Sequence, residues 1–381
     1  MRRVIFDRDH DDYRRAIRES LERIVVPHRA DWERAGIVPR TLFTDLGELG
    51  VFGFGVPEEY GGAGVTDFRF NMILMEEAHR LGVADALAGS ALQSDICLSY
   101  FSSGSDEQRA RWLPGIVSGE TITAVAMTEP GAGSDLSGIA TKAVRDGGHY
   151  VIDGAKTFIS NGINADLVIV VVRTGEHPHR GLSLLVVDRD TAGFERGRNL
   201  DKVGLHAQDT AELFFSAARV PAGNLLGAEG SGFAQLTANL TQERLSVAAG
   251  AVAGAATALD WTVEHVRNRA AFGAPIGALQ HTRFRMAEMA TEIDVARQYI
   301  DRCVVEHNAG RLDSVDAAKA KWWTTELQWR VLDTCVQLHG GLGYMTEHRI
   351  TRAWADARVQ RIYAGTTEIM KDLIGRSMKL G

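Results

Sequence analysis

The spacing of apolar residues changes twice along this 381-residue chain, and the two changes limit the folds that it can adopt. Up to about Gly119, apolar residues recur at helical spacing, as in Leu74, Met75, Ala78 and Leu81. Short β-branched runs replace this pattern from residue 121, and helical spacing returns from residue 232. Because the chain also exceeds the usual size of one hydrophobic core, we expect three packed units, covering residues 1–120, 121–231 and 232–381.

The middle zone predicts several short β-strands, because its apolar runs are rich in β-branched residues and are bounded by turn residues. The predicted strands cover residues 121–126, 150–152, 167–173, 182–188 and 212–215. Asp146-Gly147 directly before His149 predicts a hairpin with a type I′ turn, in which the central residues need positive φ. Strands at this spacing favour a small β-barrel or sandwich.

The third zone predicts long helices over residues 233–269, 279–309, 314–339 and 349–378, the last of them broken near Gly365. Four long helices with short connections are expected to pack as a bundle. The predicted fold class is therefore a multidomain α and β protein, with a helical N-terminal domain, a small middle β-barrel or sandwich and a C-terminal four-helix bundle.

Composition excludes several classes of protein. The net charge of -7 lacks the basic excess that a nucleic-acid partner would require. Cys97, Cys303 and Cys335 are far apart and the histidines lack metal-site spacing, so we expect neither a metal site nor a disulfide framework, and we expect a reducing cytoplasm as the location. The N-terminus has no signal-peptide pattern, and the longest aliphatic run, residues 167–172, is too short to be a transmembrane segment.

The most informative segment is residues 126–135, Ala-Met-Thr-Glu-Pro-Gly-Ala-Gly-Ser-Asp, which leaves a predicted strand and enters a glycine-rich turn. Free backbone N–H groups and hydroxyls in such a turn suit a flavin ring or an anionic group. A plain surface turn is the alternative interpretation of the same residues.

This segment, T-E-P-x-x-G-S-D in its last eight residues, resembles the flavin-binding signature of the acyl-CoA dehydrogenase family. Four further segments resemble family motifs in the family order: Lys-Thr-Phe-Ile-Ser-Asn-Gly at 156–162, Arg-Ala-Ala-Phe-Gly at 269–273, Gln-Leu-His-Gly-Gly-Leu-Gly-Tyr at 337–344 and Ile-Tyr-Ala-Gly-Thr-Thr-Glu-Ile at 362–369. The resemblance covers nearly the whole chain, and five ordered motifs are far more specific than one glycine-rich loop.

The resemblance implies FAD as the cofactor and assigns the residues that would contact it. Those at the flavin end would be Met127, Thr128, Gly133, Ser134, Phe158, Ile159 and Ser160. Those at the pyrophosphate and adenosine portion would be Arg269, Phe272 and Gln280, together with Gln337, Gly340, Gly341, Thr366, Thr367 and Glu368. In the family, the groups at 269–280 and 337–341 come partly from a neighbouring subunit, which implies a homo-oligomer, usually a tetramer.

The general base is the important departure from the family pattern. Many members carry a glutamate directly after the tyrosine of the I-Y-E-G-T motif, where this chain has Ala364. A branch that includes the long-chain and isovaleryl-CoA dehydrogenases places the glutamate instead in a Q-E-R-L segment, which here makes Glu243 the candidate. Helical spacing supports it independently, because position 243 lies on the apolar stripe of Leu236, Leu240 and Val247.

The resemblance implies α,β-dehydrogenation of an acyl-CoA, as in fatty acid β-oxidation, with Glu243 removing the α proton and flavin N5 accepting hydride. Ser134, Thr241, Arg244, Ala364 and Gly365 would contact the substrate, and the Ala364 N–H would polarise the thioester carbonyl. Electrons would pass to electron-transfer flavoprotein. An oxidase that uses oxygen and an idle scaffold that binds flavin or acyl-CoA are the alternatives.

Overall fold

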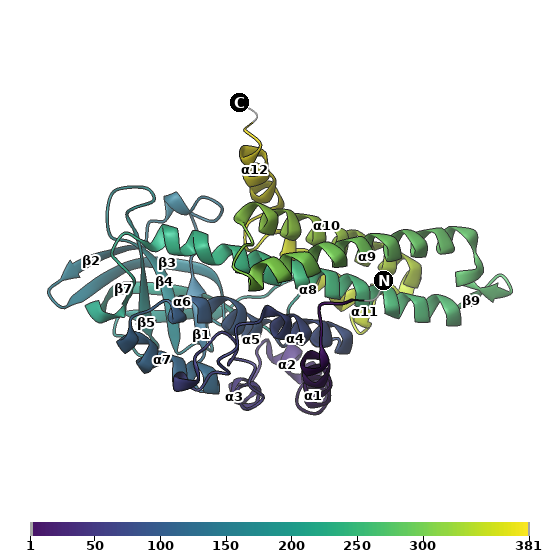
Figure 1. Ribbon diagram of the computed structural model, residues 1–381, viewed down its shortest axis with the longest axis horizontal. Coiled ribbons are helices and arrows are strands. Elements are labelled where there is room, and N and C mark those ends of the chain that lie inside the picture. The colour runs from purple at the N-terminus through teal and green to yellow at the C-terminus, as the bar shows by residue number, and fades with distance from the viewer. Residues whose placement is uncertain (1–2, 380–381) are drawn as a thin grey trace.

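The computed structural model describes residues 3–379, in which a helical N-terminal block, a β domain and a helical bundle follow one another along the chain (Figure 1). The N-terminal block contains α1 (Arg8–Ile24), α2 (Arg29–Ala35), α3 (Thr41–Glu48), α4 (Phe68–Leu81), α5 (Ala88–Ala91), the π-helical η2 (Leu92–Cys97), α6 (Leu98–Ser102) and α7 (Asp106–Ser118). The first β-strand begins five residues after α7 ends, close to the expected change of period.

The β domain is one mixed sheet with the strand order β6-β7-β3-β2-β4-β5-β8, and β1 pairs with β4 outside this path. Its strands are β1 (Thr123–Ala126), β2 (Lys142–Asp146), β3 (His149–Ser160), β4 (Leu167–Arg173), β5 (Leu182–Asp188), β6 (Phe194–Asn199), β7 (Thr210–Pro221) and β8 (Leu225–Leu226). The predicted bounds of β4 and β5 are confirmed, because both are continuous apolar runs buried on both faces. The sequence missed β2, β6 and β8.

The predicted hairpin is present, but its turn type was wrong. Asp146 pairs with His149, so Gly147 and Gly148 form the two-residue loop. Gly147 has φ of 59°, whereas Gly148 does not have a positive φ. This is the sign pattern of a type II′ turn, which needs glycine only at its first central position.

The C-terminal bundle is built around one central helix. Its helices are α8 (Gly232–Asn268), α9 (Gln280–Asn308), α10 (Ser314–His339), α11 (Arg349–Ala357) and α12 (Thr367–Ser377). By length and composition α8 would qualify as a membrane span, but 61% of its most apolar window is buried inside the protein. Such burial is typical of a core helix, and α8 packs against α4, α9 and α10.

The β domain and the bundle are joined by a close contact between the loop after β6 and α11. A Cβ on Gly204 would lie 2.6 Å from the backbone of Ala355, so only glycine permits this approach. The adjacent Leu205 N–H donates to Asp356 Oδ1 at 2.5 Å. This joint fixes one wall of the cavity described next.

Candidate functional site

A cavity of about 1030 Å³ lies where the N-terminal helices, the β domain and the bundle meet. Its walls come from α4, η2, the loop after β1, the end of β3, α8 and the segment between α11 and α12. The structure brings together here eleven of the residues predicted for the site: Met127, Thr128, Gly133, Ser134, Phe158, Ile159, Ser160, Glu243, Ala364, Gly365 and Thr366.

Glu243 is a buried carboxylate that lines this cavity. It lies on the core-facing side of α8 and is 4% exposed. The Tyr100 hydroxyl donates a long hydrogen bond of 3.3 Å to its Oε1, and the neighbouring Arg244 attracts its charge. Burial outweighs both effects and raises the pKa of Glu243 to about 7. A carboxylate with this pKa is half deprotonated at neutral pH and suits the role of a general base.

A buried ion pair holds the glycine-rich loop at the cavity wall. Lys156 Nζ donates to Glu129 Oε1 at 2.8 Å and to the Met127 carbonyl at 3.1 Å. Glu129 also accepts hydrogen bonds from the backbone N–H groups of Ala140 and Thr141. Burial alone would raise the pKa of Glu129, but these two hydrogen bonds and the pairing with Lys156 lower it. The loop is therefore rigid although it is glycine-rich.

Phe158 is directed outward by an irregularity in β3. The β3–β7 register shifts between Lys156 and Ile159, and Phe158 has φ of 60°. A positive φ is a genuine outlier for a bulky residue, and such strain collects at functional sites. The bulge exposes 67% of this ring beside the cavity. An exposed aromatic face at this place suits stacking on a planar ring.

The turn at Ala364 is also strained, because Ala364 has φ of 52°. The Nζ of the fully buried Lys321, on α10, donates to the Gly365 carbonyl at 2.6 Å and holds the turn in place. Within residues 3–379, no acceptor bonds the N–H of Ala364. This free donor lines the same cavity as Glu243.

A second group of predicted residues lies outside the cavity. Arg269, Phe272 and Gln280 lie on and beside the β9–β10 hairpin (Ala270–Ala271 and Ala274–Pro275), at the end of the bundle opposite the β domain (Figure 1). Phe272 is 96% exposed and has φ of 52°. The exposed Gln337, Gly340 and Gly341 end α10 near this hairpin, where the rings of His265 and His339 stack at 4.1 Å.

Four predicted residues neither line the cavity nor belong to this hairpin end: Thr241, Arg244, Thr367 and Glu368. Thr367 Oγ1 donates to Glu326 at 2.8 Å within the bundle, and Glu368 is exposed on α12. Thr241 and Gln242 lie on α8 beside the cavity, and Gln242 Nε2 donates to the Asp95 carbonyl at 2.6 Å. Arg244 is buried, and its Nη2 lies 3.9 Å from the position a Cβ on Gly365 would take. Thr366 caps α12.

The residues present fit a bound FAD. In the described part of the chain, the backbone N–H groups of Thr128, Gly133 and Ser134 donate to no protein acceptor, yet all three residues line the cavity. A Cβ on Gly133 would meet nothing within 4 Å, so the loop is open toward a ligand. Free donors and the exposed Phe158 ring match the carbonyl-rich, planar flavin.

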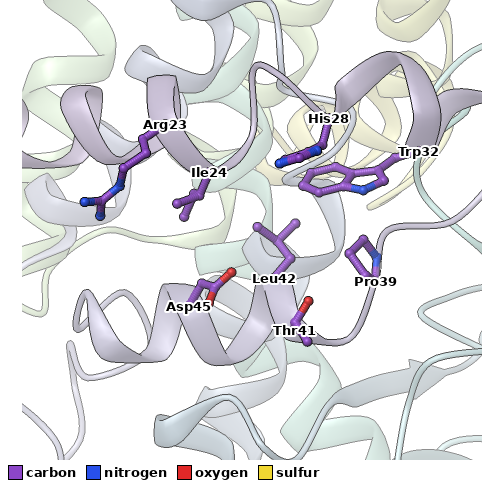
Figure 2. A pocket seen from close by; sticks show the side chains of 8 residues that line it. All are labelled: Arg23, Ile24, His28, Trp32, Pro39, Thr41, Leu42 and Asp45. Carbon is purple, nitrogen blue, oxygen red and sulfur yellow. The ribbon is translucent and has the colours of Figure 1, made fainter.

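A smaller hollow of about 360 Å³ lies on the N-terminal helices between α1, α2 and α3 (Figure 2). His28 stacks on Trp32 along one side, and Leu42 and Pro39 lie opposite (Figure 2). Its charged side chains, Arg23 and Asp45, are exposed. None of its lining residues belongs to the predicted site, so we assign the chemistry to the larger cavity.

Sequence reasoning missed two residues that support the site. Tyr100 lies 143 positions from Glu243 in the chain, and the residues around Tyr100 in the sequence do not indicate that it contacts Glu243. The sequence holds a weak signal for Lys321, because it lies in the alanine-rich stretch 317–321 of a bundle helix. Alanine-rich helix segments are commonly buried, and a lysine is rarely buried without a partner. Among residues 3–379, no cluster of histidine, cysteine, aspartate or glutamate has metal-binding geometry.

Family models match three parts of the chain: acyl-CoA dehydrogenase N-terminal domain over residues 7–120, middle domain over 124–218 and C-terminal domain over 230–379. The mitochondrial long-chain specific acyl-CoA dehydrogenase of Sus scrofa is 44% identical over 380 residues, 99% of this chain and 88% of that protein. The mitochondrial isovaleryl-CoA dehydrogenase of Oryza sativa is 32% identical, covering 98% of this chain and 92% of that protein.

Solved structures agree with these matches. An acyl-CoA dehydrogenase from Geobacillus kaustophilus superimposes with a TM-score of 0.96 at 49% identity, over 98% of this chain and 99% of that one. A glutaryl-CoA dehydrogenase from Mycobacterium smegmatis in complex with FADH2 has a TM-score of 0.90 at 27% identity, over 98% of this chain and 95% of that one. The predicted three-part fold is thereby confirmed.

Proposed function

The chain belongs to the acyl-CoA dehydrogenase family of FAD-dependent oxidoreductases, and from this premise we propose that Glu243 is the base that removes the α proton of an acyl-CoA. The observation that carries the proposal is one buried carboxylate, with its pKa raised to about 7, in the cavity that the flavin-site residues also line. The product is the trans-2-enoyl-CoA. Bound FAD supplies the acceptor for the hydride that leaves the β carbon.

Each protein group has a defined task in this proposal. Glu243 takes the proton from Cα, and Tyr100 hydrogen-bonds its Oε1 and orients the carboxylate. The N–H of Ala364 donates to the thioester carbonyl and stabilises the enolate charge that develops as the proton leaves. Lys321 is a positioning residue, because it holds the carbonyl of the same turn. Alanine at 364 therefore keeps the donor role without supplying a carboxylate.

We propose that the protein works as a homo-oligomer whose subunits contact one another through the exposed end of the bundle. Arg269, Phe272 and Gln280 lie away from their own chain's cavity, so they would complete the FAD site of a second copy. Apolar side chains are exposed on the same end and along α9, including Phe284, Val295 and Tyr344. An exposed apolar surface of this kind marks an interface.

We propose electron-transfer flavoprotein as the electron acceptor, following the family resemblance. Mixing the substrate-reduced protein with air tests the oxidase alternative: slow reoxidation without peroxide supports a dehydrogenase, and rapid peroxide formation supports an oxidase.

The test of the base is the substitution Glu243→Gln. The variant should retain FAD but lose flavin reduction by acyl-CoA by about a thousandfold or more, since proton removal loses its acceptor. Bleaching of flavin absorbance in anaerobic stopped-flow measures this. Glu264→Gln is the matched control, because Glu264 is exposed on the same helix and pairs with Arg349 at 2.8 Å. Full activity in Glu243→Gln would refute the assignment, and a wild type that no acyl-CoA reduces would favour the scaffold.

A further inference from the structure

The cavity continues beyond Glu243 along the same face of α8. Val247, Gly250 and Gly254 follow Glu243 at spacings of four, three and four residues, which places all four on one helical stripe, and all four line the cavity. The opposite wall comes from α4, including Met75 and other apolar residues. The cavity is therefore a channel between two packed helices, starting at the proposed base.

Two glycines keep this channel open. A Cβ on Gly250 would meet Met75 Sδ at 3.7 Å and His79 Nε2 at 3.8 Å. A Cβ on Gly254 would lie 2.4 Å from Gln328 Nε2 and 3.2 Å from the His79 ring. Any larger side chain at these positions would fill the space between α4, α8 and α10. Glycine in a helix interior costs stability, so these small residues are kept against helix propensity, and at Gly254 the side chains of Gln328 and His79 take up the space.

The deep end of the channel carries two polar side chains without hydrogen-bond partners. Gln328 is 2% exposed, and its Oε1 has no hydrogen-bond partner among residues 3–379. The His79 ring makes no hydrogen bond to any of residues 3–379. Burial lowers the pKa of His79 to about 4, so the ring is neutral and offers one donor and one acceptor. Leaving such groups unpaired is costly, so an oxygen-bearing ligand group or a water must meet them.

We propose that the substrate is a long-chain acyl-CoA that carries a hydroxyl or keto oxygen deep in its chain, where His79 and Gln328 bind it. This inference rests on the proposed function and names its substrate class. Gly254 lies about 16 Å beyond Glu243 along α8 at the helical rise, a distance that roughly a dozen further chain carbons span. An unsubstituted chain would desolvate both polar groups without replacing their hydrogen bonds, and such sites discriminate against the analogue that lacks the oxygen.

The test compares acyl-CoAs of equal length that differ only in one hydroxyl group and its position. Affinity is measured by calorimetric titration of the FAD-bound Glu243→Gln protein, which binds without turnover. The hydroxylated chain with the matching position should bind about tenfold more tightly than the plain chain. Equal affinity for all chains, or tighter binding of the plain chain, would show that water alone occupies the polar end and would overturn the proposal.

Variants locate the effect. Gln328→Leu and His79→Leu should each reduce the preference for the hydroxylated chain toward unity, while the affinity for the plain chain stays the same or rises. Gln328→Met, which keeps side-chain length, serves if the leucine variant does not fold. A preference that survives both substitutions contradicts the site. Failure of the wild type to reduce its flavin with any acyl-CoA contradicts the proposed function instead, so the two failures are distinguishable.

Discussion

The two ends of α8 differ in the way they contribute to one reaction. The end near the β domain holds the buried Glu243 in the cavity, with Tyr100 and the Ala364 turn from the same chain. The other end presents Arg269 and Phe272 on an exposed hairpin, and neither residue lines that cavity. We propose that the acid–base chemistry is complete within one subunit, whereas part of cofactor binding needs a second.

The largest expected effect comes from moving the base from position 243 to position 364, at the end of α8 near the β domain. Glu243→Gln should lower flavin reduction by about a thousandfold, and adding Ala364→Glu should restore about a hundredfold of that loss, because the side chain at 364 adjoins the same cavity. Single-turnover reduction by acyl-CoA measures both. Ala364→Gln in the same background is the control, and an equal gain from glutamine would mean that no base had been supplied.

The pH profile follows from the raised pKa of Glu243. The base works deprotonated, so the rate of flavin reduction should rise with pH up to a midpoint near 7 and fall about tenfold per unit below it. Rapid-mixing rates between acid and neutral pH give this curve. A midpoint near the ordinary glutamate pKa of about 4.3 would indicate a solvated carboxylate and contradict the burial of Glu243.

Subunit mixing tests the exposed end. Arg269→Ala should weaken FAD retention by about thirtyfold, because an arginine loses its charged hydrogen bonds to phosphate. The neighbouring exposed Arg267→Ala should leave FAD retention unchanged. When Arg269→Ala and Glu243→Gln proteins are dissociated and reassembled together, activity should reappear, since a mixed pair contains one site with both groups intact. Persistently inactive mixtures, shown to be mixed by mass, would place Arg269 in its own chain's site.

The smallest effect concerns stability at the buried end. The folded pKa of Glu243 lies above its unfolded value, so the folded state loses stability as the pH rises from about 4.5 to about 7. Glu243→Gln should therefore raise the free energy of unfolding at pH 8 by about 2 kcal/mol and have little effect near pH 4.5. Thermal unfolding at both pH values measures the difference. An equal change in the free energy of unfolding at both pH values would show that the charge of the buried Glu243 does not destabilise the fold.

Much of the secondary structure could be predicted because local signals were strong. α10 begins after Asp313, whose side chain caps the helix, and ends before Gly340. The strands that were missed lack such signals. β6 is a polar edge strand that pairs only with β7, and β2 has one buried residue among five. Strands of this kind are stabilised by their partners, which are distant in sequence.

The sequence by itself determined the order of helices and strands, the position of a carboxylate on the apolar stripe of α8 and the absence of one at Ala364. Tertiary structure decided that Glu243 faces a cavity, that Tyr100 and Lys321 support it, and that Arg269 does not reach it. The physical reason is that helical period depends on neighbouring residues, whereas burial and pKa depend on elements brought together from as far as 143 positions away.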